Sequence, residues 1–225
     1  MTTALVLHHD VESTTGFVGE ALTARGVRLR EHTICPEPAS PVAGGPLPDL
    51  DDTGLLVLMG SRWSVYDPAI EPWIGQELDL VRSAVERDVP VLGLCFGGQA
   101  LAAALGGRVE PTDRPEVGWV TVGSDVPELA GTWFEWHFDR FEVPPGATTL
   151  ATNDAAPQGF RQGRAVGLQF HPELDLPLLD LWIPGDREQL VQAGVDVDGL
   201  RAETVRHAGD ARARCHRLVD WFLAL

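Results

Sequence analysis

Lysine is absent from the sequence, and all 17 basic side chains are arginines. A Walker A phosphate loop and a Schiff-base mechanism each need a lysine, so both are excluded. The 33 acidic residues bring the net charge to −16. A surface of this charge repels the phosphates of nucleic acids, so we expect neither DNA nor RNA to bind. We interpret the acidity as a source of solubility.

Cysteine and long apolar runs are scarce as well. The three cysteines, Cys35, Cys95 and Cys215, lie far apart without CxxC spacing, so neither a disulfide framework nor a zinc site is predicted. No apolar run approaches the roughly 20 residues that cross a bilayer. Residues 1–12 lack the basic region of a signal peptide. We therefore expect a soluble cytoplasmic protein with no membrane partner, no metal and no cofactor.

The rest of the composition is that of a globular protein, with 225 residues of which 44% are hydrophobic. Apolar runs that suit buried strands alternate with segments of helical spacing. In order, these are a strand (3–9), a helix (14–26), two strands (27–34 and 54–60), a helix (72–88), a strand (89–95) and a helix (97–107). This alternation predicts an α/β fold, an open, doubly wound and mostly parallel sheet with helices on both faces.

Residues 108–170 change in character. Short runs with turn residues between them predict antiparallel strands at the sheet edge, together with the closing central strand, at 118–123, 147–153, 158–163 and 165–170. The chain from residue 177 on predicts two or three helices, the last at about 199–224. We find no domain boundary and predict a single domain over residues 1–225 with a helical tail at about 177–225.

Cys95 stands where a buried strand meets a helix, within the stretch PVLGLCFGGQALAAALGG (90–107). In α/β proteins, ligands bind at the carboxyl ends of the strands. Glycines two positions before and after Cys95 suit a strained strand–nucleophile–helix turn. The helix N-terminus favours a thiolate, and the N–H of Phe96 points where an oxyanion would form. An isolated cysteine would be interpreted as a buried apolar residue, but these neighbours favour a nucleophile.

A cysteine nucleophile needs a base, and His171 is the best candidate among the seven histidines. It follows the apolar run 165–170, and Glu173 comes two positions later. Residues i and i+2 of an extended chain point the same way, so Glu173 can reach the His171 ring and fix its tautomer. The alternative is a surface turn with a solvated Glu173. The strand-end position that His171 shares with Cys95 favours the catalytic base.

Together, GLCFGGQ around Cys95 and GLQFHPE around His171 resemble the class I glutamine amidotransferases, which use a Cys-His-Glu triad. The resemblance covers nearly the whole chain and implies the flavodoxin-like fold of that family. Residues 56–67 (LVLMGSRWSVYD), here called the oxyanion loop, resemble the glycine-rich loop of glutaminase domains of the GMP synthetase type. Residues 135–154 resemble the family's His-Gly-Asp segment and the strand after it.

The resemblance implies a role for each matching residue. Cys95 attacks the γ-carboxamide of L-glutamine, His171 protonates the departing ammonia and then activates water, and Glu173 orients His171. The backbone N–H groups of Gly60 and Phe96 hold the oxyanion. Four further residues match contacts to glutamine in the family, namely Gln99, Trp136, His137 and Phe138.

Two segments depart from the family's pattern. The oxyanion loop has Met59-Gly60-Ser61 where the family has Gly-Gly-Pro. This change bears on how readily the loop turns into its active form. Phe138 replaces the glycine of His-Gly-Asp, which bears on the width and specificity of the glutamine pocket.

Three other functions are compatible with parts of the sequence. A dienelactone-hydrolase-like enzyme also has a cysteine on such a turn, but it needs an acid between the nucleophile and a late histidine, and here the order is His171 then Glu173. A γ-glutamyl peptide or conjugate hydrolase would use the same triad and differ only in the leaving amine. A regulatory subunit without activity would have no use for the three residues together.

The 225 residues contain no Ser-Gly-Gly-Val-Asp-Ser pyrophosphatase loop and no Walker A motif. If ammonia is transferred, we expect its acceptor on a separate synthetase subunit that docks over the strand ends. The expected partners are therefore L-glutamine and such a subunit.

Overall fold

The computed structural model describes residues 2–192 and 194–225. In this part of the chain the strands are β1 (Thr3–His8), β2 (Arg28–Thr33), β3 (Leu55–Leu58), β4 (Val91–Leu94), β5 (Val109–Ser124), β6 (Gly131–Phe141), β7 (Thr148–Thr152), β8 (Pro157–Gln162) and β9 (Ala165–Leu168). The helices are α1 (Gly16–Ala24), α2 (Glu71–Glu86), α3 (Phe96–Ala104), α4 (Leu176–Gln192) and α5 (Val197–Leu223), with a short 3-10 helix, η1 (Pro68–Ile70), before α2.

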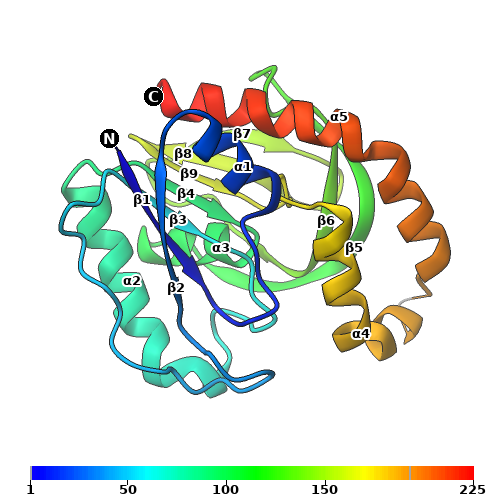
Figure 1. Ribbon diagram of the computed structural model, residues 1–225, viewed down its shortest axis with the longest axis horizontal. Coiled ribbons are helices and arrows are strands. Elements are labelled where there is room, and N and C mark those ends of the chain that lie inside the picture. The colour runs from blue at the N-terminus through cyan, green and yellow to red at the C-terminus, as the bar shows by residue number, and fades with distance from the viewer. Residues whose placement is uncertain (1, 193) are drawn as a thin grey trace.

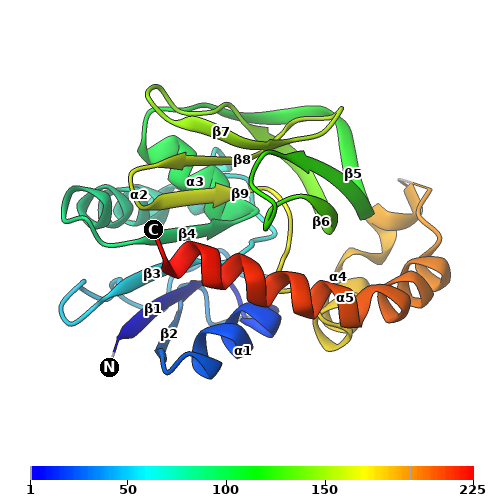
Figure 2. The ribbon, with the colours of Figure 1, turned by 90° about the horizontal axis from the view of Figure 1, so that it is seen from above.

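These strands form one sheet in the order β2-β1-β3-β4-β9-β8-β7-β5-β6. Neighbouring strands pair in parallel along β2-β1-β3-β4-β9. The pairs along β9-β8-β7-β5-β6 are antiparallel. β9 joins the two halves, since it is parallel to β4 and antiparallel to β8 (Figure 2). The predicted α/β class is confirmed. The antiparallel part is larger than an edge, because it comprises β8, β7, β5 and β6.

The parallel half of the sheet is buried on both faces. α1 and α5 cover one face, and α2 and α3 cover the other (Figure 2). Side chains alternate along a strand, so Leu55 and Val57 of β3 pack in the core under α1 and α5, while Leu56 and Leu58 pack in the core under α2 and α3. This two-sided burial explains why β3 and β4 appear in the sequence as continuous apolar runs.

The antiparallel half differs most from the sequence prediction. β5 begins at Val109, well before the predicted strand at 118–123, and β6 lies where no strand was predicted. The two strands form a long antiparallel pair whose register shifts between Pro111 and Glu116. β6 carries the buried polar residues Glu135 and His137 among its aromatic residues, so it lacks a clear alternation of apolar and polar side chains.

The helical tail consists of α4 and α5 in the described residues, in agreement with the two or three helices predicted. α4 lies at the end of the sheet where the parallel strands end, and α5 runs across α1 (Figure 1). None of the described helices combines the length and the apolar character that crossing a membrane requires.

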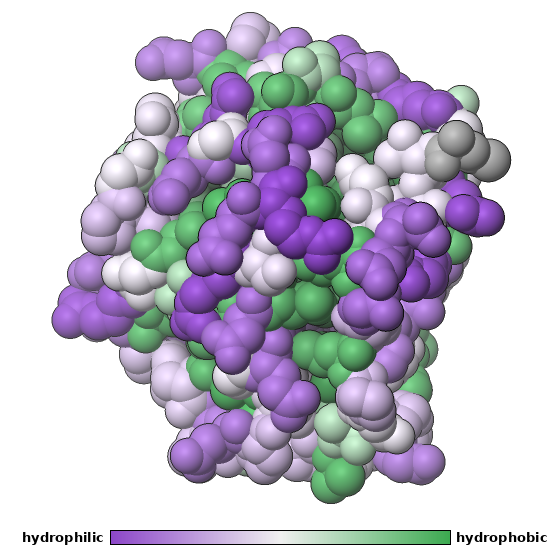
Figure 3. All heavy atoms as spheres, turned by 90° about the vertical axis from the view of Figure 1, so that its left-hand side faces the viewer, coloured by the Kyte–Doolittle hydropathy of each residue, from purple (hydrophilic) through white to green (hydrophobic). Residues whose placement is uncertain are grey.

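The surface is largely polar on the face that Figure 3 shows, where hydrophilic side chains surround small apolar areas. The exposed large apolar side chains of the described residues are spread along the chain, and they are Val11, Val42, Tyr66, Leu181, Val191 and Val205. Single apolar side chains of this kind are normal on a protein surface.

Candidate active site

Cys95 occupies the sharp turn between β4 and α3. Its backbone has φ 50° and ψ −109°, a conformation that residues other than glycine rarely adopt. Glycines are needed around it because side chains would collide with the chain. A Cβ atom at Gly97 would lie 2.2 Å from the carbonyl oxygen of Leu58, and one at Gly98 would lie 2.4 Å from that of Leu168. The close approach of α3 to the sheet holds the thiol at the strand ends.

His171 follows β9, the strand next to β4. Its Nδ1–H donates to Oε1 of Glu173 over 2.8 Å, and the two side chains are 4% and 1% exposed. Its backbone N–H donates to the carbonyl oxygen of Phe134 over 2.8 Å, which anchors the residue to β6. The bond to Glu173 leaves Nε2 free of any hydrogen-bond partner among the described residues, and His171 lines the same pocket as Cys95. The structure thus brings together the three residues proposed from the sequence as a triad.

The surroundings of His171 favour its protonated form. Burial alone lowers the pKa of a histidine, yet the charge of Glu173 and the interaction with Cys95 raise the pKa of His171 well above its usual value. A protonated imidazole beside a thiolate is a nucleophile already paired with its acid. Such a pair can attack a carbonyl carbon and return the proton to the leaving group.

The Cys95 sulfur has two further polar neighbours. The side-chain amide of Gln169 donates toward Sγ over 3.8 Å, and Sγ lies 3.8 Å from the carbonyl oxygen of Trp136. Gln99 donates from its own amide to Oε1 of Gln169 and to the carbonyl oxygen of Asp139. Gln99 is therefore placed behind the thiol. Gln169 was not predicted, although its position two residues before His171 puts it on the same side of an extended chain.

Gly60 lies beside the imidazole, since a Cβ atom there would be 3.1 Å from Cε1 of His171. The Met59 carbonyl accepts a hydrogen bond of 3.1 Å from the N–H of Gly97, so the Gly60 N–H on the same peptide points the opposite way. Phe96 is the first residue of α3, and its N–H has no partner within the helix. Gly60 and Phe96 stay predictions as the oxyanion donors.

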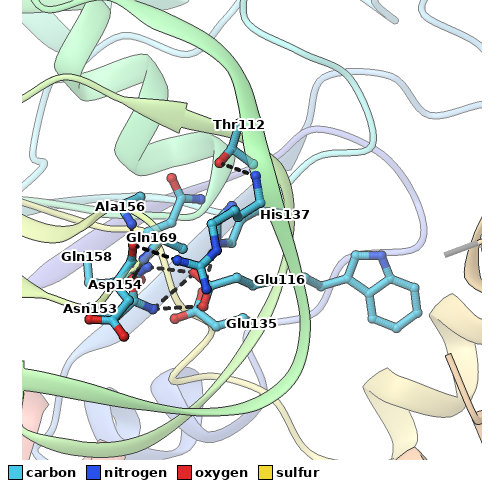
Figure 4. A network of polar contacts seen from close by, with 12 residues as sticks. Thr112, Glu116, Glu135, His137, Asn153, Asp154, Ala156, Gln158 and Gln169 are labelled. Carbon is cyan, nitrogen blue, oxygen red and sulfur yellow. Dashed lines mark hydrogen bonds and ion pairs between the residues drawn. The ribbon is translucent and has the colours of Figure 1, made fainter. Parts of the chain in front are cut away.

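The segment 136–139 meets the pocket through Trp136, which lines it. Phe138 packs in the apolar cluster beneath α4. His137 points into a buried polar network (Figure 4), where Nδ1 donates to the Asp139 carbonyl over 2.9 Å and Nε2 donates to Glu116 over 3.2 Å. Of the four residues predicted to contact glutamine, Trp136 is thus the one whose side chain the structure places on the pocket wall.

Glu116 and Glu135 lie side by side in this network (Figure 4). Glu116 accepts hydrogen bonds from Asn153 and Gln158 as well as from His137. Burial works against its charge, but these bonds lower the pKa of Glu116. Glu135 is fully buried, and burial together with the charge of Glu116 raises its pKa well above the usual range. Among the described residues, no group of three or more His, Cys, Asp or Glu side chains could hold a metal ion.

Asp139 ties this segment to the oxyanion loop. The Tyr66 hydroxyl donates to Oδ1 of Asp139 over 2.6 Å, and the Ser64 hydroxyl donates to the other carboxylate oxygen. The aspartate therefore occupies both of its oxygens with loop residues.

α4 closes the pocket in front of Cys95. The Trp182 ring lies across His171 with centroids 4.9 Å apart, and across Trp136 at 5.7 Å. Its indole N–H donates to the carbonyl oxygen of Glu12 over 2.8 Å. The sequence predicted α4 only as part of a tail, and no site residue was expected on it.

Charged side chains form the outer part of the pocket. Arg62 of the oxyanion loop lies 3.5 Å from Glu12 and 3.7 Å from Asp186 of α4. Burial raises the pKa of Asp186, and Arg62 opposes this shift. Asp10 also lines the pocket. This part of the pocket wall therefore carries three carboxylic acid side chains and one arginine, Arg62.

Fold and site together define an α/β protein with a cysteine on a strand-to-helix turn and a buried His–Glu pair after the neighbouring strand. Residues 48–180 match the family described as glutamine amidotransferase class-I. This range is more than half of the chain and includes Cys95, His171 and Glu173. The chain belongs to the class I glutamine amidotransferase family, a family of enzymes, and the resemblance predicted from the sequence is confirmed.

Known relatives agree with this assignment. The glutamine-hydrolysing GMP synthase of Thermomicrobium roseum is 37% identical over 132 residues, which are 53% of this chain and 23% of that protein. The chain thus spans less than a quarter of the length of this relative. The crystal structure of a glutamine amidotransferase from Thermotoga maritima matches with a TM-score of 0.85 and 25% identity, covering 98% of this chain and 97% of that one. A glutamine amidotransferase from Methylobacillus flagellatus matches with a TM-score of 0.84 and 26% identity, covering 100% and 95%.

Proposed function

We propose that this chain hydrolyses the γ-amide of L-glutamine through a thioester on Cys95, giving glutamate and ammonia. The observation that carries the proposal is the strained turn that holds Cys95 beside the buried His171–Glu173 pair. The family, and a relative whose name includes glutamine hydrolysis, support the same reaction.

In the first half-reaction, the Cys95 thiolate attacks the γ-carbonyl carbon and the carbonyl oxygen becomes an oxyanion. The N–H groups of Gly60 and Phe96 hold this charge. The C–N bond then breaks while His171 gives its proton to the departing nitrogen. Ammonia leaves, and a γ-glutamyl thioester remains on Cys95.

In the second half-reaction, His171 is neutral and takes a proton from water as the water oxygen adds to the thioester carbon. The C–S bond breaks, glutamate leaves, and the pair of thiolate and protonated His171 is restored. Glu173 keeps the ring in one orientation through both steps, since its bond to Nδ1 leaves Nε2 for the chemistry.

Glutamine binds, in this proposal, against Trp136 and the backbone of the segment 136–138. Gln99 supports this segment indirectly, because its side-chain amide donates a hydrogen bond to the carbonyl oxygen of Asp139. The ammonia acceptor is proposed to lie on a separate synthetase subunit that covers the strand ends. Support for such a partner comes from the GMP synthase of Thermomicrobium roseum, in which the matching region is only 23% of the protein.

A second candidate is hydrolysis of γ-glutamyl peptides or conjugates, with the same triad and a larger leaving amine. The carboxylates of Asp10, Glu12 and Asp186 on the outer pocket wall favour it, since they attract a conjugate whose leaving part carries a second, cationic amine. The first candidate has the support of the family, and the second rests on this charge alone.

The test measures glutamate release from L-glutamine and, separately, from a γ-glutamyl dipeptide. We expect release from glutamine by the wild type and none by Cys95→Ala. Cys35→Ala is the matched control, because burial raises the pKa of the Cys35 thiol to about 11 and keeps it protonated. Release from the dipeptide alone would replace the first candidate by the second. Release that persists in Cys95→Ala would reject both.

A further inference from the structure

His9 and Glu77 form a buried pair behind the oxyanion loop. His9 directly follows β1, Glu77 lies on α2, and both are 0% exposed. His9 Nε2 lies 2.9 Å from Oε1 of Glu77, and its Nδ1 lies 3.0 Å from the carbonyl oxygen of Gly60. Gly60 and Ser61 line the pocket, whereas His9 and Glu77 are not among its described lining residues. The pair therefore contacts the loop from the side away from the pocket.

The partners of His9 determine where its protons lie. The Gly60 carbonyl can only accept, so Nδ1 carries a proton, and the Glu77 carboxylate accepts from Nε2–H. The pairing with Glu77 favours the imidazolium form of the ring. Burial opposes this charge, but Glu77 raises the pKa of His9 above its usual value.

Stability alone does not account for this pair. Removing two charges from water costs roughly several kcal/mol for each ion, and a well-packed apolar pair is often as stable or more stable. The second oxygen of Glu77, Oε2, has no hydrogen-bond partner among the described residues. The bond that distinguishes the pair is the one that it makes to Gly60.

The same imidazole also contacts the other side of the proposed oxyanion hole. Its centroid lies 4.4 Å from that of the Phe96 ring, edge to face at 62°. The peptides on either side of Gly60 are thus both held, one by the bond from Gly97 N–H to the Met59 carbonyl and the other by His9.

The orientation of the Gly60–Ser61 peptide matters for the chemistry. In a trans peptide the C=O and N–H groups point in opposite directions. A carbonyl held behind the loop is kept out of the pocket, where its partial negative charge would repel an oxyanion. Without the donor on His9, the peptide is free to turn its oxygen inward.

We propose that His9 and Glu77 are positioning residues that lock the Gly60–Ser61 peptide with its carbonyl turned away from the pocket. The proposal rests on the proposed function in one respect, that an oxyanion forms beside Gly60. The lock acts on the transition state and not on glutamine binding, so its loss lowers kcat and leaves KM nearly unchanged.

The first experiment compares two substitutions of His9. An asparagine amide nitrogen lies near the position of Nδ1 and keeps the donor to Gly60, whereas a glutamine amide nitrogen lies near Nε2 and loses it. His9→Gln is expected to lower kcat for L-glutamine by about 100-fold, because an inward Gly60 carbonyl opposes the oxyanion about as strongly as one donor stabilises it, with KM changed by less than about threefold. His9→Asn is expected to recover most of that loss.

His8→Gln is the matched control. His8 is also buried and also bonds to a glutamate, Glu31, over 2.8 Å, with its other nitrogen 2.8 Å from Ser13 Oγ. None of these bonds reaches Gly60. His8→Gln is expected to keep kcat within about twofold of the wild type while changing the Tm about as much as His9→Gln does.

A second experiment separates this proposal from the proposed function. In acetylation by p-nitrophenyl acetate, the Cys95 thiolate attacks the ester carbon, an oxyanion forms, and p-nitrophenolate leaves as the acetyl thioester forms. In alkylation by iodoacetamide, a C–S bond forms and iodide leaves without any oxyanion. His9→Gln is expected to slow acetylation of Cys95 by about 100-fold and to leave alkylation unchanged.

Equal acetylation rates in the wild type and His9→Gln would overturn the proposal, as would equal losses in acetylation and alkylation. If the wild type is acetylated but releases no glutamate from glutamine, the proposed function fails. In that case the ratio of the acetylation rates still decides for or against the role of His9.

Discussion

The Tyr66 hydroxyl donates a hydrogen bond of 2.6 Å to the Asp139 carboxylate, and so joins the oxyanion loop to β6. Tyr66 is the one tyrosine of the sequence, which makes it a specific reporter of this bond. Burial and the Asp139 carboxylate raise the pKa of Tyr66 above its usual value. We expect Asp139→Asn to lower that pKa, as followed by ultraviolet absorbance during alkaline titration. The same titration curve in both proteins would contradict the contact.

Substitution of Gly97 by alanine tests the turn that holds Cys95, and the same substitution at Gly75 on α2 is the control. A Cβ atom at Gly97 would meet the Leu58 carbonyl at 2.2 Å, whereas one at Gly75, on the exposed face of α2, meets nothing within 4 Å. Gly97→Ala is expected to lower the free energy of unfolding by about 1–3 kcal/mol and to abolish turnover. Gly75→Ala is expected to raise it by about 0.5–1 kcal/mol. Urea unfolding measures both, and a stable, active Gly97→Ala would show that the turn tolerates a side chain.

Glu173→Gln tests the electrostatic role of the third triad residue. The carboxylate raises the pKa of His171, so His171 keeps its proton, and the thiolate its partner, up to that raised pKa. Glutamine at this position still accepts from Nδ1–H but carries no charge. We expect the alkaline limb of the kcat/KM profile to move to lower pH and kcat to fall by at least about tenfold. An alkaline limb that stays in place would mean that Glu173 does not set the His171 pKa.

Because Glu135 is buried, we expect the free energy of unfolding to depend on pH through this residue. Its pKa is raised in the folded state, so folded Glu135 keeps a proton that the unfolded chain releases. Its contribution to stability is complete below the ordinary carboxyl pKa and is lost as pH rises towards the folded pKa. Glu135→Gln is therefore expected to raise the Tm at neutral pH and to leave it unchanged at about pH 4. The exposed Glu37 serves as control, since Glu37→Gln should show no such difference.

The triad could be proposed from the sequence because its geometry is encoded locally. Cys95 lies between a short buried strand and a glycine-bounded helix, and His171 and Glu173 are two residues apart after another buried strand. The parallel order of β4 and β9 then brings the two strand ends together. Short, sharply bounded apolar runs make such an arrangement predictable.

The rest of the site depends on contacts between distant segments. Trp182 and Asp186 reach the pocket from α4, which contains Pro184 and shows no strong amphipathic pattern. His9 and Glu77 are 68 positions apart, and nothing in either local sequence indicates the other. Gln169 is different, because its spacing of two residues from His171 places it on the same side of an extended chain. The single domain over residues 1–225 and the cytoplasmic location stay predictions from the sequence.

The most direct test of the central claim is to look for the covalent intermediate. The wild type would be mixed with L-glutamine, quenched in acid, digested and examined by mass spectrometry of the peptide that contains Cys95. We predict a γ-glutamyl group on Cys95 that hydroxylamine removes, because the thioester precedes hydrolysis. Glutamate released with no adduct on Cys95, or with the adduct on another residue, would contradict the account.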